Sequence, residues 1–240
     1  MATITLREAR VRIRRLFLEE TTPGSQDFVD DTGDEPYEVD DAYDQGCSWQ
    51  LEQVIHNADQ AGKLRRHDHP YLLRYLVHSS IAISAGTSDY PCPTDMLRRI
   101  TLYVAGREAV YVEPSQDRLI QLWPSQFGPA KGEALWTFVP SADGVRVIRV
   151  YVAGVGTTPN EPVAGIFDYY RTVTRLAFQS PPTLPSSLTD CDDPFNFGPI
   201  KRAAAQLFRK AGQIRRAEEL EQQAMEDVAL IVPPPQQVKA

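Results

Sequence analysis

The sequence predicts an α+β fold in which helices from the two ends of the chain form a bundle and an antiparallel β region is inserted between them. Two observations carry this prediction. Near both termini, apolar residues recur every three or four positions, which is the spacing of one buried helix face. In the middle of the chain they alternate at period two between short turns, as in strands. The expected parts are 1–66, 67–180, 181–232 and an extended arm, 233–240.

Composition places the chain in the ordinary soluble globular class. Its 240 residues are 42% hydrophobic and 24% charged, which suffices for a sizeable core. The net charge of −7 argues against a general nucleic-acid binder, because phosphate binding needs a basic field. No apolar run approaches the ~18 residues that span a bilayer, and the N-terminus lacks the hydrophobic core of a secretion signal. Cys47, Cys92 and Cys191 are widely spaced, so we expect reduced thiols in a protein made in a cytoplasm.

The first predicted helix starts at the N-terminus, where Thr5–Glu8 has the spacing of a capping box. Its apolar face runs to the neighbourhood of Glu20, and its opposite face is rich in arginine. Arg7, Arg10 and Arg14 are therefore candidates for a contact with a neighbouring subunit. A solvated surface helix accounts for this face equally well.

An acidic loop is expected over Thr21–Glu38, which is rich in Pro, Gly, Asp, Ser and Thr and has little periodicity. The chain has no Lys or Arg between Leu16 and Gly62. Such segregation of charge often marks complementary surfaces of neighbouring subunits, although a solvated loop is as good an explanation. The loop could also border a DNA channel, where negative charge keeps DNA from sticking. The candidate contact residues in the loop are Asp30, Asp31 and Asp34.

Two patterns invite a metal site, and neither fits. Counted from Asp30 as a calcium loop, the sixth position is Glu35 instead of glycine and the twelfth is Asp41 instead of glutamate. His67 and His69 form an H-x-H pair, which alone lacks the three or four ligands of a zinc site. We therefore expect a surface turn at the histidines and no bound metal or other cofactor.

A second helix is expected to open at Asp40 and Asp41, whose carboxylates favour the positive end of a helix dipole. Gly62 is expected to end it. From Tyr71 the pattern becomes that of strands and hairpins. The expected elements are a strand over Tyr71–Ile83, a helical turn over Met96–Arg99, a hairpin of Ile100–Val104 with Glu108–Val112, a helix over Ser115–Trp123 with Leu119 and Leu122 inward, a hairpin of Glu133–Val139 with Val145–Val152, and a last strand over Val163–Arg171.

Aromatic residues of the β region allow a second function, a peptide- or carbohydrate-binding module. Exposed aromatic rings commonly bind such ligands, and Tyr103, Tyr111, Trp123 and Trp136 are the candidates. Burial of these rings in the core explains them better, so the module remains an alternative.

The C-terminal stretch predicts two helices and an arm. Gly198 and Pro199 suit a helix start, and Gly212 suits a left-handed cap between the helices. Three consecutive prolines then exclude helix and impose an extended exit. We expect this arm to reach a partner, because its stiffness lowers the entropy lost on docking, although many termini stay disordered. The arm residues are Pro233, Pro234, Pro235, Gln236, Gln237, Val238 and Lys239.

Local catalytic motifs are missing from the sequence. It has no G-x-S-x-G elbow, no G-x-x-x-x-G-K-[ST] phosphate loop, no H-E-x-x-H and no G-x-G-x-x-G after a strand. We therefore expect no enzyme, while a hydrolase with a dispersed site stays open as a residual possibility.

The order of several segments resembles the head-to-tail adaptor proteins of tailed bacteriophages. These segments are a helix containing Ile55, Asn57 and Ala58, the run S-A-G-T-S-D-Y-P-C-P-T-D-M-L-R-R-I from Ser84, the Tyr169–Arg171 strand, and D-D-P-F-N-F-G-P-I-K-R-A-A-A-Q-L before two helices. The match covers roughly 42–232, and its collinear order carries it rather than any single motif. The long acidic loop departs from the pattern.

The resemblance implies a structural protein of the virion neck without cofactor or reaction. It implies a ring, commonly of twelve copies, docked beneath the portal protein of the DNA-filled head. The helical bundle would face neighbouring copies, and the C-terminal arm would lodge against the portal. The opposite side would hold a downstream tail or nozzle protein, and DNA would pass through the channel without sequence-specific binding.

Overall fold

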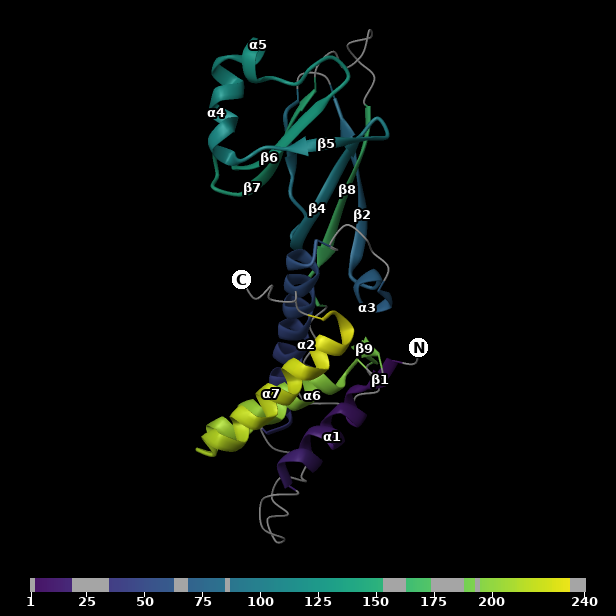
Figure 1. The fold of residues 1–240 in the computed structure, drawn as a ribbon, viewed down its shortest axis with the longest axis vertical. Coiled ribbons are helices and arrows are strands. Elements are labelled where there is room, and N and C mark those ends of the chain that lie inside the picture. The colour runs from purple at the N-terminus through teal and green to yellow at the C-terminus, as the bar shows by residue number, and fades with distance from the viewer. Residues whose placement is uncertain are drawn as a thin grey trace, which may run out of the picture. The chain divides into compact units, whose positions relative to one another are not determined.

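The computed structural model confirms the α+β class and divides the chain into two compact units. Unit 1 combines Met1–Arg74 with Val173–Ala240, and unit 2 is Tyr75–Thr172 (Figure 1). The second unit thus lies within the predicted span 67–180 and is shorter at both ends. The structure describes residues 3–18, 35–62, 69–84, 87–152, 163–173, 188–192 and 195–233.

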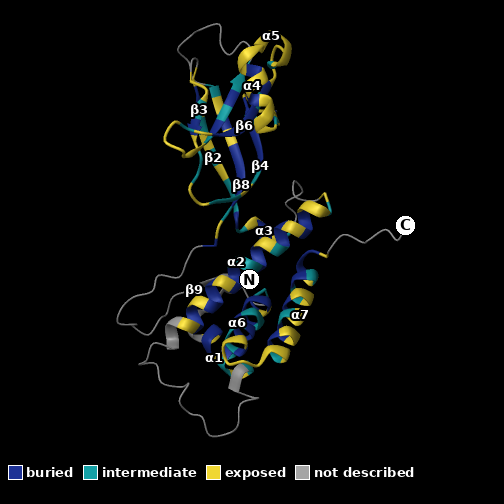
Figure 2. Cartoon of the chain, turned by 90° about the vertical axis from the view of Figure 1, so that its left-hand side faces the viewer, coloured by how far each residue is buried: buried dark blue, intermediate teal, exposed yellow. Residues whose placement is uncertain are grey.

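The four longest helices of unit 1, which are α1, α2, α6 and α7, pack through small and apolar side chains. Helix α6 contacts each of the other three, so it lies at the centre of their packing. The buried faces that the three-and-four spacing predicts are visible as dark stripes in Figure 2. The elements are β1 (Thr3–Thr5), α1 (Leu6–Leu18), α2 (Glu35–Gln60), α3 (Pro70–Leu73), β9 (Leu188–Asp192), α6 (Phe197–Lys210) and α7 (Ile214–Ile231).

Helix α2 begins earlier than predicted. It starts at Glu35 instead of Asp40, so residues that we assigned to the acidic loop are helical. Pro36 is compatible with this start, because the first turn of a helix does not need the N–H that proline lacks. Asp40 consequently lies one turn inside the helix and is buried. The predicted ends hold: Gly62 and Gly212 both adopt positive φ, at 64° and 78°, where helices end in a left-handed residue.

Helices α2 and α6 approach each other closely at Gly46. A Cβ atom at this position would lie 2.7 Å from the carbonyl oxygen of Pro199. Ala203, Ala204 and Ala205 are fully buried on α6 and keep the remaining contacts thin. Small residues on both sides are therefore what lets the two backbones meet.

Unit 2 is a seven-stranded sheet with the order β2-β8-β4-β5-β6-β7-β3. Tyr90 on the edge strand β3 bonds residues that follow the other edge strand, β2: its hydroxyl accepts from the Ser84 N–H and donates to the Thr87 carbonyl. The elements are β2 (Leu76–Ile83), β3 (Asp89–Pro91), β4 (Met96–Val104), β5 (Arg107–Tyr111), α4 (Pro114–Leu122), α5 (Pro124–Phe127), β6 (Ala134–Pro140), β7 (Arg146–Val152) and β8 (Val163–Arg171).

The sheet is mixed, so the prediction of a wholly antiparallel region is wrong at one pair. Strands β5 and β6 run parallel, with Val110 opposite Leu135 and Tyr111 opposite Trp136. A parallel pair needs a crossover, and helices α4 and α5 supply it between these two strands. Both predicted hairpins are confirmed, β4 with β5 and β6 with β7.

Three local predictions in this region are wrong. Tyr71–Leu73 belongs to helix α3 instead of a strand, because His69 caps that turn by accepting from the Tyr71 N–H. Met96–Arg99 is strand, held by its pairing with β8. Leu119 and Leu122 point outward from α4, since the buried side of this short helix carries Asp117 and Ile120.

The core of unit 2 is a cluster of aromatic and β-branched side chains. Trp136 contacts the rings of Tyr111, Phe138 and Phe167 edge-on, at centroid distances of 5.1, 5.4 and 5.5 Å. Such edge-to-face pairs add to the stabilisation from buried area. Within the described residues, no helix is long and apolar enough to cross a membrane.

Candidate functional site

The described residues offer little support for a metal site or for a site of nucleophilic catalysis. These residues contain no group of three His, Cys, Asp or Glu that could hold a metal ion. His78 Nδ1 lies 2.7 Å from Asp168 Oδ1 across strands β2 and β8, as in a base held by a carboxylate. Among the described residues His78 has no hydrogen bond to a hydroxyl or thiol, so this pair lacks the nucleophile of a triad. The surfaces that could bind a partner are therefore the candidate sites.

The root of the C-terminal arm is fixed in unit 1. Helix α7 ends at Ile231, and Val232 turns the backbone to an extended conformation. The Asn57 side-chain N–H donates to the Val232 carbonyl at 3.0 Å, in a buried contact. Pro233 follows and is exposed. The arm therefore leaves from a carbonyl that α2 holds in place.

The predicted arm residues beyond this root lie outside the described residues. They are Pro234, Pro235, Gln236, Gln237, Val238 and Lys239.

Helix α1 uses one of its predicted contact arginines inside the chain. Arg10 is buried, with its side chain 8% exposed, and forms a two-pronged ion pair with Asp40, which is 4% exposed. Nε of Arg10 donates to Oδ1 of Asp40 at 2.5 Å. Arg10 is thus unavailable as a surface contact, and our assignment of it to the exposed face is wrong because residues Ala9, Arg10 and Ile13 share the buried side.

The other predicted contact residues have different outcomes. Arg14 is half-buried on α1. The side chain of Arg7 and the residues Asp30, Asp31 and Asp34 lie outside what the structure describes.

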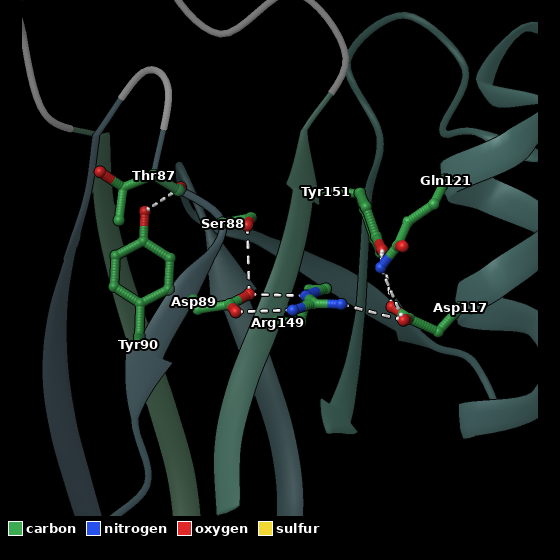
Figure 3. Close-up of polar contacts among 8 residues, drawn as sticks. All are labelled: Thr87, Ser88, Asp89, Tyr90, Asp117, Gln121, Arg149 and Tyr151. Carbon is green, nitrogen blue, oxygen red and sulfur yellow. Dashed lines mark hydrogen bonds and ion pairs between the residues drawn. The ribbon is translucent and has the colours of Figure 1, made fainter. Parts of the chain in front are cut away.

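A polar clamp fastens helix α4 to the sheet of unit 2 (Figure 3). Arg149 on β7 donates to both carboxylate oxygens of Asp89 on β3, each at 2.6 Å, and to Asp117 on α4 at 3.0 Å. The Tyr151 hydroxyl donates to Asp117 at 2.6 Å, and the Gln121 amide donates to the same carboxylate at 2.8 Å. One carboxylate therefore receives bonds from three side chains on two elements.

The electrostatics of this clamp favour its charged form. The hydrogen bond from Arg149 holds the pKa of Asp89 below its usual range, and the same bond raises the pKa of Arg149. Burial and the bond to Asp117 raise the pKa of Tyr151, so this hydroxyl stays protonated and remains a donor. The clamp thus joins β3, β7 and α4 through charged and hydrogen-bonded side chains.

Helices α4 and α5, and Trp123 between them, present apolar side chains to solvent. Trp123 is 49% and Phe127 is 47% exposed, with ring centroids 6.4 Å apart. Leu119 and Leu122 are exposed on the same stretch. Of the aromatic candidates for a binding module, Trp123 alone is this exposed, whereas Trp136 is fully buried as the core interpretation predicts. Tyr103 and Tyr111 are half-buried.

Two arginines lie on the aromatic rings at one edge of the core. The Arg99 guanidinium carbon lies 3.2 Å from the centroid of Tyr111 and 5.6 Å from that of Trp136. The Arg146 guanidinium carbon lies 3.9 Å from the centroid of Phe138. Burial and the nearby charges of Arg98 and Arg146 hold the pKa of Arg99 below its ordinary value. We call Arg99, Arg146, Tyr111 and Phe138 the arginine–aromatic surface.

Sequence reasoning missed the clamp and this surface. Arg146 and Arg149 lie in a predicted strand, and the local sequence pattern does not show which residues their side chains contact. The partners come from distant segments, such as Asp89 and Asp117 for Arg149. Comparisons with protein-family models and with curated proteins find no match to this chain.

Proposed function

We propose that this chain is a structural adaptor that connects the portal of a tailed bacteriophage to its tail. In this proposal several copies, commonly twelve, form a ring in the virion neck and DNA passes through its channel. The collinear resemblance over roughly 42–232 and the lack of local catalytic motifs support it. The C-terminal arm would bind the portal protein, and another surface would bind a downstream tail or nozzle protein.

The observation that carries the proposal is the anchored root of the arm. Asn57 holds the Val232 carbonyl, and Pro233 is exposed immediately beyond it. An arm that starts from a fixed point and is stiffened by three prolines loses less entropy on docking than a flexible tail. Its position at the end of a packed helix suits a segment whose contacts lie on another protein.

The test is truncation of the arm. A chain lacking Pro233–Ala240 should keep its fold and its unfolding free energy and should lose binding to portal rings from the same genome. A chain whose arm keeps its composition in scrambled order is the matched control for length and charge. Unchanged portal binding by the truncated chain would remove the arm from the proposal.

The alternative function, a peptide- or carbohydrate-binding module, now depends on one region. The exposed Trp123 and Phe127 favour it, while Trp136 is too buried to contact a ligand. Replacing Trp123 with Ala should abolish binding to an array of glycans or peptides if the module exists. The Trp136→Phe variant is the control for a change in the core. If the unmodified chain binds no glycan or peptide on the array, this alternative is removed.

A further inference from the structure

The arginine–aromatic surface has positive charge that the described residues do not neutralise. Arg99 and Arg146 lie against ring faces, and within the described parts of the chain neither forms an ion pair or hydrogen bond with a carboxylate. Among the described residues, the carboxylate whose charge raises the pKa of Arg99 is that of Glu113, and no ion pair joins the two side chains. The lowered pKa of Arg99 agrees with a cation that is partly desolvated and repelled by its arginine neighbours.

This geometry suits an anion. A guanidinium that stacks on a ring through its flat face leaves its N–H edge available, and that edge matches a carboxylate or phosphate. Two such edges side by side favour a ligand with several acidic groups. A polynucleotide is a poorer match, because the chain has a net charge of −7 and a backbone of phosphates needs a wider basic field.

The chain itself contains a segment with this chemistry. Glu19–Glu35 has seven carboxylates and no Lys or Arg, and Phe28 lies in its middle. Many carboxylates of the described helices already have partners, as Asp40 does in Arg10 and Asp227 does in Lys201. The acidic segment and the arginine–aromatic surface thus have opposite charges.

We propose that Arg99 and Arg146, stacked on Tyr111 and Phe138, bind the acidic segment Glu19–Glu35 of a second copy of this chain. The choice of a second copy rests on the proposed ring, in which each copy would offer its acidic segment to the next. Carboxylates of the segment would accept hydrogen bonds from the N–H edges of the two guanidiniums. The contact would thereby help to join neighbouring subunits.

The first experiment measures the site with a peptide. A fluorescein-labelled peptide Glu19–Glu35 is titrated, by fluorescence anisotropy, with the full chain carrying D27N, D30N, D31N and D34N, so that its own segment cannot compete. Adding R99Q and R146Q should weaken binding at least about tenfold, because charge-assisted hydrogen bonds are lost. Adding R118Q and R215Q instead removes the same charge from exposed positions and should leave binding unchanged.

Further variants keep this test decisive. If the glutamine pair unfolds, R99K with R146K retains the charge, loses the planar stack and should still weaken binding severalfold. Equal peptide affinity in all arginine variants would overturn the proposal. Stronger binding of a single-stranded DNA oligomer through the same two arginines would overturn the choice of occupant.

The second experiment asks whether the segment comes from another copy. Full-length chains with R99E and R146E are mixed with full-length chains carrying D27K, D30K and D31K, and association is followed by sedimentation velocity. We expect the mixture to form larger species than either variant alone. Mixed chains that stay monomeric would overturn the second copy as the occupant.

The portal test of the arm stays separate from these measurements. If the chain docks on portal rings but its affinity for the acidic peptide does not depend on Arg99 and Arg146, the proposed function stands and this inference is wrong. If the chain binds the peptide and associates as expected but never docks on a portal, this inference stands and the adaptor proposal is wrong.

Discussion

Each of the two units fastens a helix with an arginine, but the two arginines lie at different depths. In unit 1, Arg10 and Asp40 are almost fully buried between α1 and α2. In unit 2, Arg149 is 19% exposed and shares its charge between Asp89 and Asp117. Water competes with the second contact and hardly reaches the first. The same pair of residue types should therefore matter more to stability in unit 1 than in unit 2.

The two units also differ in the size of the side chains that fill their cores. Unit 1 brings helices together through Gly46 and the alanines of α6, with little room between the backbones. Unit 2 fills its core with the large rings of Trp136, Phe138 and Phe167. A larger side chain at these helix contacts should therefore lower the unfolding free energy of unit 1. The loss of hydrogen bonds on the surface of unit 2 should lower the unfolding free energy moderately.

The largest effect is expected from Asp40→Ala. Removing this carboxylate leaves the buried Arg10 facing an apolar methyl group, and breaking a buried ion pair costs about 3–5 kcal/mol of unfolding free energy. Urea unfolding followed by far-ultraviolet circular dichroism measures it. The neighbouring Asp41 is exposed and bonds only Gln45 among the described residues, so Asp41→Ala is the control. Equal losses of unfolding free energy in both variants would show that burial of the Arg10–Asp40 pair adds nothing to stability.

A smaller loss is expected from Asp117→Ala. This change removes the acceptor for Arg149, Tyr151 and Gln121 and should cost about 1–2 kcal/mol, after allowance for the partial exposure of Arg149. High salt should reduce the cost, because exposed charges are screened. Arg118→Ala, on the exposed side of the same helix, should leave the unfolding free energy unchanged. A cost as large as that of Asp40→Ala would erase the contrast between the units.

A comparable or smaller loss is expected from Gly46→Ala. Alanine favours a helix interior by about 1 kcal/mol over glycine, but its Cβ would meet the Pro199 carbonyl oxygen at 2.7 Å. Overpacking costs about 1–3 kcal/mol, so the net change should be a loss of about 1 kcal/mol in urea unfolding. Glu52→Ala, at an exposed position of α2, serves as the control for helix propensity. A stabilised Gly46→Ala variant would show that the two helices can separate.

The smallest effect concerns alkaline pH in unit 2. Burial, and a hydrogen bond that Tyr169 donates to Asp95, raise the pKa of Tyr169 to about 12, and burial raises that of Tyr170 to about 12. Because these pKa values are raised on folding, the stabilisation is complete below pH about 10 and is lost as the pH rises toward 12. Tyr169→Phe should flatten this decline in urea unfolding, and Tyr103→Phe should not. An identical decline in both variants would remove Tyr169 from the explanation.

Much of the fold could be predicted from local patterns. Helical spacing placed α6 and α7, and the glycines at 62 and 212 marked where helices end. Turn chemistry located both hairpins. These features depend on residues near one another in sequence, so periodicity and backbone preference suffice to find them.

The errors arose where distant residues decide the outcome. The parallel pair of β5 and β6 and the strand conformation of Met96–Arg99 depend on partners far along the chain. Arg10 was predicted to be a surface contact, since its partner Asp40 lies thirty positions away and local periodicity cannot reveal the pair. For the candidate sites, the binding role of the arm stays a prediction from sequence, whereas the arginine–aromatic surface depends on residues from separate strands that only the folded chain brings together.

Electron microscopy of the full chain mixed with portal rings encoded in the same genome tests the adaptor proposal most directly. We expect a closed ring of copies on the portal, with the segment after Val232 extending into the portal surface. The chain lacking Pro233–Ala240 should leave the portal bare under the same conditions. A chain that stays monomeric and never associates with the portal would contradict the proposal.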